Sequence, residues 1–218
     1  MIPGAPGAGA PPMLRHKLHT AGRTAHDLYP VRGRPDMIDA RNYRVEDKLK
    51  NGAVVTIRAI RPDDRNRIVE AFGHLERETI YSRFFRYKSQ LTDEELRAFT
   101  EADFKNVVAL VVTIPAGGED ETVIGSGSYV LYGPSDAQGR AEVAFTVEED
   151  YQGQGIASRI LKHLVDIARE QGVLRFEAEV LAENRAMLTV FAHSGLPMKT
   201  SLEEGVVYVS LSLQAQAS

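Results

Sequence analysis

The sequence predicts a mixed α/β fold, largely antiparallel in its N-terminal half, with a strand, a tight glycine turn and a helix at its centre. Residues 141–147 alternate between apolar and polar or small side chains, as a strand does. Beyond Gly155, apolar residues recur at helical spacing until Gly172, a natural C-terminal stop. Two β-rich runs, 107–114 and 122–131, are separated by a Pro/Gly turn, which indicates a hairpin.

The elements before the hairpin follow from apolar spacing and capping signals. A first strand is marked by Val54, Ile57 and Ile60. A helix is then expected to run to about His74, with Asp63 as its N-cap. Thr92 and Glu95 form a capping box that predicts a second helix. Between these helices, residues 81–88 combine aromatic and basic side chains, which suits core packing or one wall of the site for an acceptor substrate.

The elements after the hairpin complete the predicted order. A turn at 133–136 leads into strand 141–147, and a strand around Phe176, Ala178 and Val180 follows the central helix. Asn184 is expected to cap a further helix, and residues 206–213 end the sheet. The expected order is strand, two helices, three antiparallel strands, helix, strand, helix, strand.

The chain divides into a tail, residues 1–45, and one domain, residues 46–218. Met1–Pro12 contains four Pro, three Gly and three Ala and is expected to be disordered. Residues 13–44 hold seven Lys or Arg against three Asp, together with His16, His19 and His26. Because no carboxylate cluster at ligand spacing accompanies these histidines, a solvated linker is favoured and no metal site is expected.

Composition excludes several classes of protein. The 218 residues are 43% hydrophobic, which is enough for a sizeable core. There is no cysteine, which excludes disulfides and suits a reducing cytoplasm. A net charge of −4 gives no general reason to expect nucleic acid. No apolar run approaches the length of a membrane span, so no membrane association is expected.

The glycine turn indicates a phosphate site. The first turn of a helix has unpaired N–H groups and a partial positive charge, and Gly153 and Gly155 leave room for a ligand to approach them. A plain tight turn remains the alternative. A Walker loop is disfavoured because Ile156 and Ala157 stand where Lys and Ser or Thr are needed. A Rossmann fingerprint would need a third glycine, where the chain has Ser158.

The run Gln152-Gly153-Gln154-Gly155-Ile156-Ala157 resembles the Q/RxxGxG/A signature of the GNAT acetyltransferase superfamily. Residues 184–196 are similar to that family's NxxxxxxYxxxGF helix, with Phe191 in place of Tyr and Leu196 in place of Phe. The resemblance implies a GNAT-like fold and acetyl-CoA as cosubstrate. Its pyrophosphate would bind the turn, and its pantetheine arm would lie along strand 141–147. The implied cofactor-binding residues are Phe145, Val147, Gln152, Gly153, Gln154, Gly155, Ile156, Ala157, Ser158 and Asn184.

Four segments narrow the resemblance to bacterial Pat-like protein lysine acetyltransferases: 57–64, 78–85, 91–96 and 141–147. This resemblance implies transfer of acetyl to a protein lysine, on an AMP-forming acyl-CoA synthetase as partner. Many such enzymes carry a fused regulatory domain, for which residues 1–45 are too short, so regulation of that kind is not expected. The acyl chain preference and the oligomeric state stay open.

The transfer needs a base, because a lysine amine with a pKa of about 10.4 is protonated at neutral pH. Glu142 is the candidate, since its strand would run beside the pantetheine and the Pat-like resemblance places a catalytic Glu there. A salt-bridged edge position is the structural alternative, and Glu177 or Glu179 would be considered next. Phe191 cannot protonate the leaving thiolate, which leaves Tyr151, Ser194, water or departure as thiolate.

Two rival functions remain compatible with the sequence. One is acetylation of a small-molecule amine such as a polyamine, an aminoglycoside or an amino acid. The other is a non-catalytic acyl-CoA-binding module that reports metabolic state to a partner. Turnover of acetyl-CoA with any amine would separate the second rival from both enzymes.

Overall fold

The computed structural model describes residues 38–118, 120–132 and 139–214. These residues form one eight-stranded sheet in the order β1-β2-β3-β4-β5-β6-β8-β7. The strands are β1 (Arg44–Lys48), β2 (Val54–Ala59), β3 (Val107–Gly117), β4 (Asp120–Leu131), β5 (Arg140–Val147), β6 (Arg175–Leu181), β7 (Met198–Glu203) and β8 (Val206–Ser212). Within the described residues only β5 and β6 pair in parallel, and the other neighbours are antiparallel.

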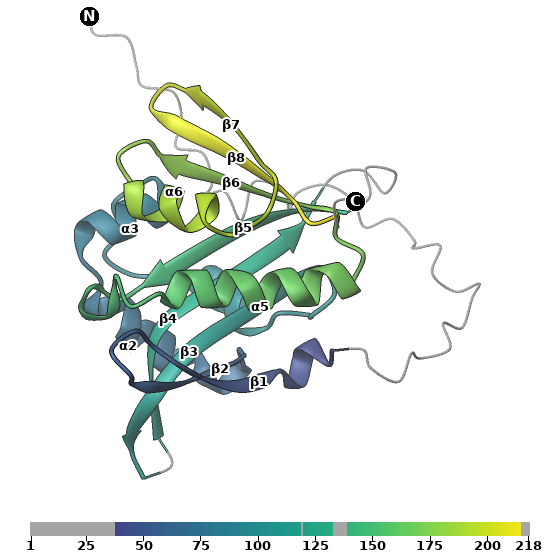
Figure 1. The fold of residues 1–218 in the computed structure, drawn as a ribbon. Helices are drawn as coiled ribbons and strands as arrows, with labels where there is room; N and C mark the ends of the chain where they lie inside the picture. Colours follow the sequence, from purple (N-terminus) through teal and green to yellow (C-terminus); the bar gives the residue numbers. More distant parts are fainter. Residues whose placement is uncertain (1–37, 119, 133–138, 215–218) are drawn as a thin grey trace, which may run out of the picture.

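Helices cover both faces of the sheet (Figure 1). The longest, α5 (Ile156–Glu170), crosses one face beside α6 (Arg185–Ala192), and this side is called the α5 face. The other side, the α2 face, carries α2 (Arg65–His74), α3 (Arg77–Phe84) and α4 (Asp93–Thr100). Short 3₁₀ turns lie at Ala40–Asn42 (η1), Pro62–Asp64 (η2) and Glu149–Tyr151 (η3). No helix in the described ranges is both long and apolar enough to cross a membrane.

The amphipathic face of α5 builds much of the core. Ile156, Ile160, Leu164 and Ile167 are buried, as their spacing predicts. The helix lies close to β4, where a Cβ added at Gly127 would meet the Ile160 side chain at 2.5 Å. A glycine is therefore required at the centre of the sheet for α5 to pack against it.

Several predicted elements are confirmed. The hairpin of residues 107–131 is β3 and β4, and its strands continue through Pro115 to Gly117. Strand 141–147 is β5, the central helix ends before Gly172, and Thr92 and Glu95 form the expected capping box. The predicted turn at 133–136, Met1–Pro12 and the three N-terminal histidines lie outside the described residues.

Other expectations about elements were wrong. Asp63 is not the N-cap of α2, because the chain first makes the η2 turn, in which Asp63 is exposed. The neighbouring Asp64 is buried instead and accepts from the Arg61 N–H at 2.9 Å. The structure also contains β1, α3 and β7, so between residue 38 and the hairpin there are three α-helices rather than two. Residues 38–45, assigned to the tail, belong to the fold, and Ala40 is buried.

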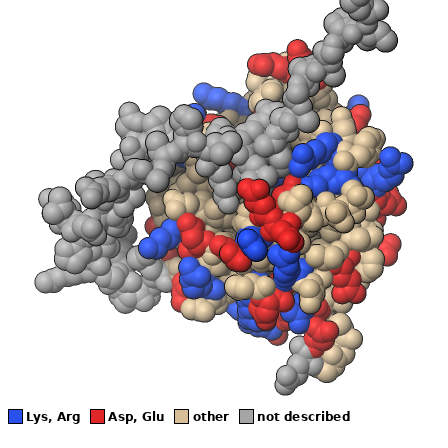
Figure 2. Space-filling view, turned by 180° about the vertical axis from the view of Figure 1, so that it is seen from behind, with Lys and Arg blue, Asp and Glu red and all other residues tan. Residues whose placement is uncertain are grey.

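Charges on the α2 side are interspersed. Figure 2 views the molecule from behind Figure 1 and shows acidic and basic side chains next to one another on the described surface. Arg67 and Asp120 form an ion pair at 2.7 Å, and Arg65 pairs with Asp93. This arrangement does not create a large field of one sign.

Candidate active site

The most prominent feature of the sheet is a groove where β5 and β6 separate. The two strands pair only over Arg140–Glu142 and Arg175–Glu177, yet β5 continues to Val147 and β6 to Leu181. The resulting groove has a volume of about 960 Å³ and is lined by β5, β6, the glycine turn, α3 and α6. Backbone groups of β5 that face β6 beyond Glu142 have no partner on that strand, so an extended ligand could hydrogen-bond to them.

The glycine turn closes one end of the groove. Gly153 and Gly155 have φ of +73° and +87°, values that side chains with a Cβ rarely adopt. A Cβ added at Gly153 would meet nothing within 4 Å, so this position is open to a ligand. Gly155 immediately precedes α5 and has no capping side chain, which leaves the first N–H groups of the helix facing the turn. The turn therefore has the geometry that an anion requires.

Two basic residues that sequence reasoning missed support this turn. Arg159 donates to the carbonyl oxygens of Gln154 and Gly155 at 3.4 and 3.3 Å, and its Nε lies 3.0 Å from the Asp47 carboxylate. The Lys50 N–H donates to the Gln154 carbonyl at 3.3 Å, and Lys50 also lines the groove. Both contacts join the turn to the β1–β2 hairpin about a hundred residues earlier in the chain, so no local motif signals them.

The acidic run Glu148-Glu149-Asp150 lies just before the glycine turn, and its first two side chains make contacts on the α2 side. Glu149 accepts from the Glu76 N–H at 3.0 Å, which directs this carboxylate toward the start of α3. Glu148 lies 3.8 Å from His74 of α2. Burial raises the pKa of Glu148 above its ordinary value, with the nearby acidic residues adding to this and His74 opposing it. The negative charges of these two side chains are therefore held on the α2 side, away from the opening above Gly153.

Nearly all of the sequence-predicted site residues line the groove. Gln152 bridges the turn and β5, because its Nε2 donates to the Val147 carbonyl at 3.1 Å. Asn184 caps α6, accepting from the Met187 N–H at 3.0 Å, as expected. Gln154 is not among the groove-lining residues. Its carbonyl oxygen accepts hydrogen bonds from the Lys50 N–H and the Arg159 guanidinium. The groove-lining members are Glu142, Phe145, Val147, Gln152, Gly153, Gly155, Ile156, Ala157, Ser158 and Asn184.

Glu142 lies where two depressions of the surface meet. It lines the groove and also a neighbouring cavity of about 540 Å³ over β6, β7 and β8. Glu142 pairs with Val130 of β4, and Ala144 pairs with Ser128, so these side chains point to the α2 face. Across the groove, burial lowers the pKa of the Arg83 guanidinium while the charges of Glu142 and Glu95 oppose that change.

The neighbouring cavity is rich in carboxylates and tyrosines. Glu177, Glu179 and Glu203 line it with Glu142, together with Tyr132, Tyr208 and one lysine, Lys199. Burial raises the pKa of Glu177, whose carboxylate accepts a hydrogen bond from the Tyr132 hydroxyl. A cationic or amine group would find complementary charge in this cavity, immediately beside Glu142.

A model of the GNAT acetyltransferase domain matches residues 55–197 of this chain. The chain belongs to the GNAT acetyltransferase family. It is an N-acetyltransferase that uses acetyl-CoA as its cosubstrate. The non-catalytic module considered from the sequence does not agree with this assignment.

Several relatives give the similarity in detail. Acetyltransferase Pat of Mycolicibacterium smegmatis is 33% identical over 148 residues, covering 68% of this chain and 43% of that protein. Acetyltransferase PA5475 of Pseudomonas aeruginosa is 29% identical over 65% of this chain and 74% of its own length. Thialysine N-epsilon-acetyltransferase of Bos taurus is 29% identical over 52% of this chain and 69% of that protein. The chain thus spans less than half the length of the Mycolicibacterium relative.

Among solved structures, the GNAT domain of S. lividans PAT superposes with a TM-score of 0.70 at 35% identity, covering 78% of this chain and 96% of that one. The acetyltransferase YncA of Salmonella typhimurium, described with its cofactor acetyl-CoA, superposes with a TM-score of 0.59 at 20% identity, covering 75% and 96%. The mixed sheet is therefore the GNAT fold, and this chain resembles Pat within that family.

The GNAT helix α6 departs from the family pattern at Phe191. This side chain is buried, with 1% of its surface exposed, and packs edge to face on Phe145 with ring centroids 6.0 Å apart. Tyr151 lines the groove, whereas Ser194 donates to the Phe191 carbonyl at 2.7 Å and is not among the groove-lining residues. Of the two hydroxyl donors that the sequence offered, Tyr151 is the one placed in the groove.

The aromatic and basic residues 81–88 divide between packing contacts and the lining of the groove. Tyr81 and Tyr87 pack together with ring centroids 5.0 Å apart, and Lys88 lies over the Phe84 ring. Arg83 and Phe85, in contrast, line the groove opposite β5. This segment of the GNAT domain therefore supplies packing and one wall of the groove.

Proposed function

We propose that this enzyme transfers acetyl from acetyl-CoA to the ε-amino group of a protein lysine, with an AMP-forming acyl-CoA synthetase as its partner. The identity to the proteins named Pat and PAT supports this choice among GNAT activities. The observation that most directly supports this function is that Glu142 borders both the groove and the acidic cavity beside it. A base at that junction can reach an amine entering from one side and a thioester lying in the other.

In this proposal the cosubstrate lies along the groove, from the glycine turn to Glu142. The pyrophosphate binds the N–H groups at the start of α5, with Gly153 leaving space and Lys50 adding positive charge. The pantetheine arm extends along the edge of β5 past Val147 and Phe145 toward Glu142. The thioester then lies near the point where β5 and β6 come together, since the groove ends there.

The reaction follows from this placement. Glu142, directly or through one water, takes a proton from the lysine ammonium, and the neutral amine attacks the thioester carbon. A carbon–nitrogen bond forms, the carbon–sulfur bond breaks, and CoA departs as a thiolate that takes up the second amine proton through water. Arg83 lies near Glu142, and the charge of Glu142 opposes the lowering of the Arg83 pKa by burial.

A small-molecule amine is the second candidate acceptor. The acidic cavity beside Glu142 would suit a polycation, and the Bos taurus relative is named for acetylation of thialysine. A protein lysine presents one cationic amine on a flexible stem, which the same cavity accommodates.

The test offers both acceptors in one mixture. The enzyme and acetyl-CoA are incubated with an AMP-forming acetyl-CoA synthetase and spermidine, and mass spectrometry follows acetylation of each. We expect one synthetase lysine to be acetylated and adenylation activity to fall, because acetylation removes the charge and donors of that lysine. Rapid acetylation of spermidine with an unmodified synthetase would instead select the small-molecule function.

A further inference from the structure

The edge strand β7 has a free side at the border of the sheet. It is the last strand in the sheet order and, among the described residues, pairs only with β8, in an uninterrupted register (Figure 1). Edge strands are usually protected from further pairing by charges, proline or bulges. Strand β1, at the other border, is charged at four of its five positions, whereas β7 has only Lys199 and Glu203, with no proline and no bulge. The β7 edge is therefore open to another strand.

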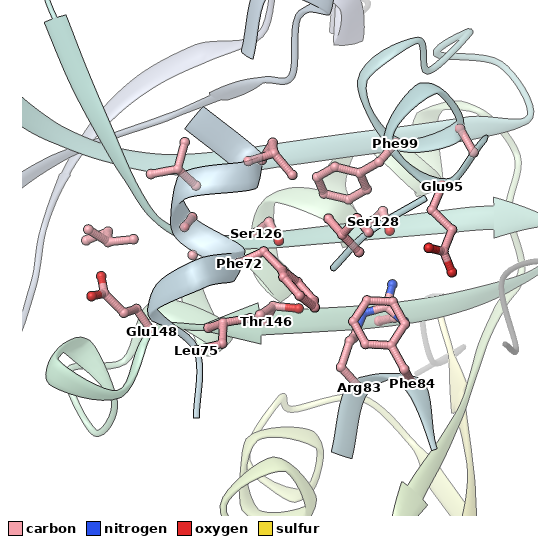
Figure 3. A pocket seen from close by; sticks show the side chains of 18 of the residues that line it. Phe72, Leu75, Arg83, Phe84, Glu95, Phe99, Ser126, Ser128, Thr146 and Glu148 are labelled. Atoms are coloured by element: carbon pink, nitrogen blue, oxygen red, sulfur yellow. The ribbon is translucent and has the colours of Figure 1, made fainter. Parts of the chain in front are cut away.

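The apolar side chains of β7 are exposed, in contrast to those beneath the helices. On the α2 face, helices α2, α3 and α4 place Phe72, Phe84 and Phe99 over the central strands (Figure 3). Met198 and Leu202 of β7, however, are 39% and 66% exposed. An edge that presents apolar side chains together with free backbone groups favours pairing with another strand.

The hydrogen bonds between β7 and β8 decide which backbone groups of β7 face outward. The Pro197 carbonyl accepts from the Ser212 N–H at 2.9 Å, so every second residue from Pro197 onward bonds to β8. The N–H and C=O groups of the residues between them, Met198, Thr200 and Leu202, then point away from β8. A strand that pairs with β7 would exchange hydrogen bonds with these three residues.

The charges of β7 are arranged symmetrically about Ser201. Lys199 lies two residues before it and Glu203 two residues after it, on the face that lines the acidic cavity. Neither side chain has an ion-pair partner in the part of the chain that the structure describes. An antiparallel copy of β7 centred on Ser201 would place Lys199 of each chain opposite Glu203 of the other. The same register sets Thr200 opposite Leu202, so the charges and the outward backbone groups select one alignment.

We propose that two copies of this chain associate through β7, antiparallel and centred on Ser201, so that their sheets become continuous. The same surface then contacts itself, as a twofold dimer requires. The twofold axis runs perpendicular to the sheet, which keeps both acidic cavities on one side and brings Lys199 of each copy to the margin of the other's cavity. A six-residue edge is a small interface, so the dimer should be reversible. The inference does not depend on which amine is the acceptor.

Sedimentation velocity on the full chain, from about 1 µM to about 100 µM, tests for the dimer, whose fraction should rise over this range. Lys199→Glu and Glu203→Lys each set like charges opposite one another at both pairs, so each should raise the Kd of the dimer at least roughly tenfold. The double variant restores opposite charges in reversed order and should dimerise as the wild type does. A monomer at every concentration, or a dimer that both single variants leave unchanged, would overturn the proposal.

The chain has no cysteine, so a single introduced thiol reports the register. Ser201→Cys places two thiols at the axis, where opposed Cα atoms lie about 4.5 Å apart, within the reach of a disulfide. Oxidation with copper phenanthroline should therefore give a covalent dimer on a non-reducing gel. Thr200→Cys is the matched control, because its two thiols lie two strand positions apart and beyond that reach. Preferential cross-linking of Thr200→Cys, or none in either variant, would contradict the pairing. A monomeric enzyme in which the synthetase protects the Ser201→Cys thiol from alkylation would assign the edge to the acceptor instead.

Discussion

Glu142 and Glu177 lie directly opposite each other in parallel register, and they form the last residue pair before β5 and β6 separate. Glu177 accepts a hydrogen bond from Tyr132, and burial raises its pKa. Glu142 instead borders both the groove and the acidic cavity. Two glutamates at one level of the sheet therefore have different environments, and this difference can be tested by changing each in turn.

Glu142→Gln should lower kcat/KM by roughly 10²–10⁴, because it removes the proton acceptor and keeps the shape of the side chain. Calorimetry should show acetyl-CoA affinity little changed. The wild-type kcat/KM should rise with pH as the base deprotonates, and this limb should disappear in the variant. Glu177→Gln is the matched comparison, and a larger loss there than at Glu142 would transfer the role of base to the neighbouring strand.

Gly155→Val should weaken acetyl-CoA binding at least roughly tenfold, or about 1.4 kcal/mol. A β-branched residue is strained at φ +87°, and its Cβ would lie 2.5 Å from the Arg159 guanidinium. The clash would displace Arg159, whose contacts with Asp47 and the turn carbonyls hold the glycine turn to the β1–β2 hairpin. Gly155→Ala separates backbone strain from branching, and calorimetry on both folded variants gives the measurement. Unchanged affinity in Gly155→Val would remove this turn from the cosubstrate site.

Asp64→Asn should lower the free energy of unfolding by about 3–5 kcal/mol, because it leaves the buried Arg58 without its principal counterion. Arg58 donates two hydrogen bonds of 2.7 Å to Asp64, and both side chains are at most 1% exposed. Burial alone would raise the pKa of Asp64, but its bonds to Arg58 and the Arg61 N–H hold the pKa below its ordinary value.

The control for this pair is Asp93→Asn, which removes the exposed Arg65–Asp93 ion pair. Exposed pairs contribute about 0–1 kcal/mol, so its effect on urea unfolding should be small. Because the pKa of Asp64 is lowered by folding, the stability it provides is present above the ordinary aspartate pKa and is lost as pH falls below it. Equal midpoints for the two variants would contradict the importance of the buried pair.

His163 should make stability depend on pH below about 7. Burial lowers its pKa, outweighing Asp47 and Asp166, and its Nδ1 lies 2.6 Å from the Tyr43 hydroxyl. The unfolded chain therefore binds a proton more readily near pH 6.5, so stability is full above that pH and declines as pH falls. In His163→Gln this decline in melting temperature should become shallower. An identical pH profile in both proteins would show that other groups cause it.

The parts of the fold in which apolar side chains are buried at regular spacing could be predicted from the sequence. β5, α5 and the β3–β4 hairpin carry clear alternation or helical spacing, and their bounds were close to the observed ones. β1 and β7 were missed because they are edge strands, and every residue of β7 is exposed, so no apolar period marks them. They form by pairing with β2 and β8. α3 was missed because its eight residues have a weakly amphipathic pattern.

The site was predictable where one segment carries it. The glycine turn and Glu142 follow from local pattern and family resemblance, and the structure brings them into one groove. Lys50 and Arg159 could not be found in that way, because their places depend on contacts between distant segments. The separation of β5 from β6 also has no sequence signature, since both strands continue with ordinary β-forming residues beyond the last pair.

Because β5 and β6 pair over a short length, the sheet consists of two parts with a small contact between them. Strands β1 to β5 form one part and β6, β8 and β7 the other, and three residue pairs of β5 and β6 join them. A pantetheine arm lying in the groove would occupy the space between the two parts and could hydrogen-bond to the edge of β5. A ligand that binds only the folded state stabilises it by about 2.7 kcal/mol at a hundred times its Kd. The lifetime of this protein against unfolding and proteolysis would therefore follow the acyl-CoA supply of the cell, with the borders of β5 and β6 gaining the most protection from hydrogen exchange.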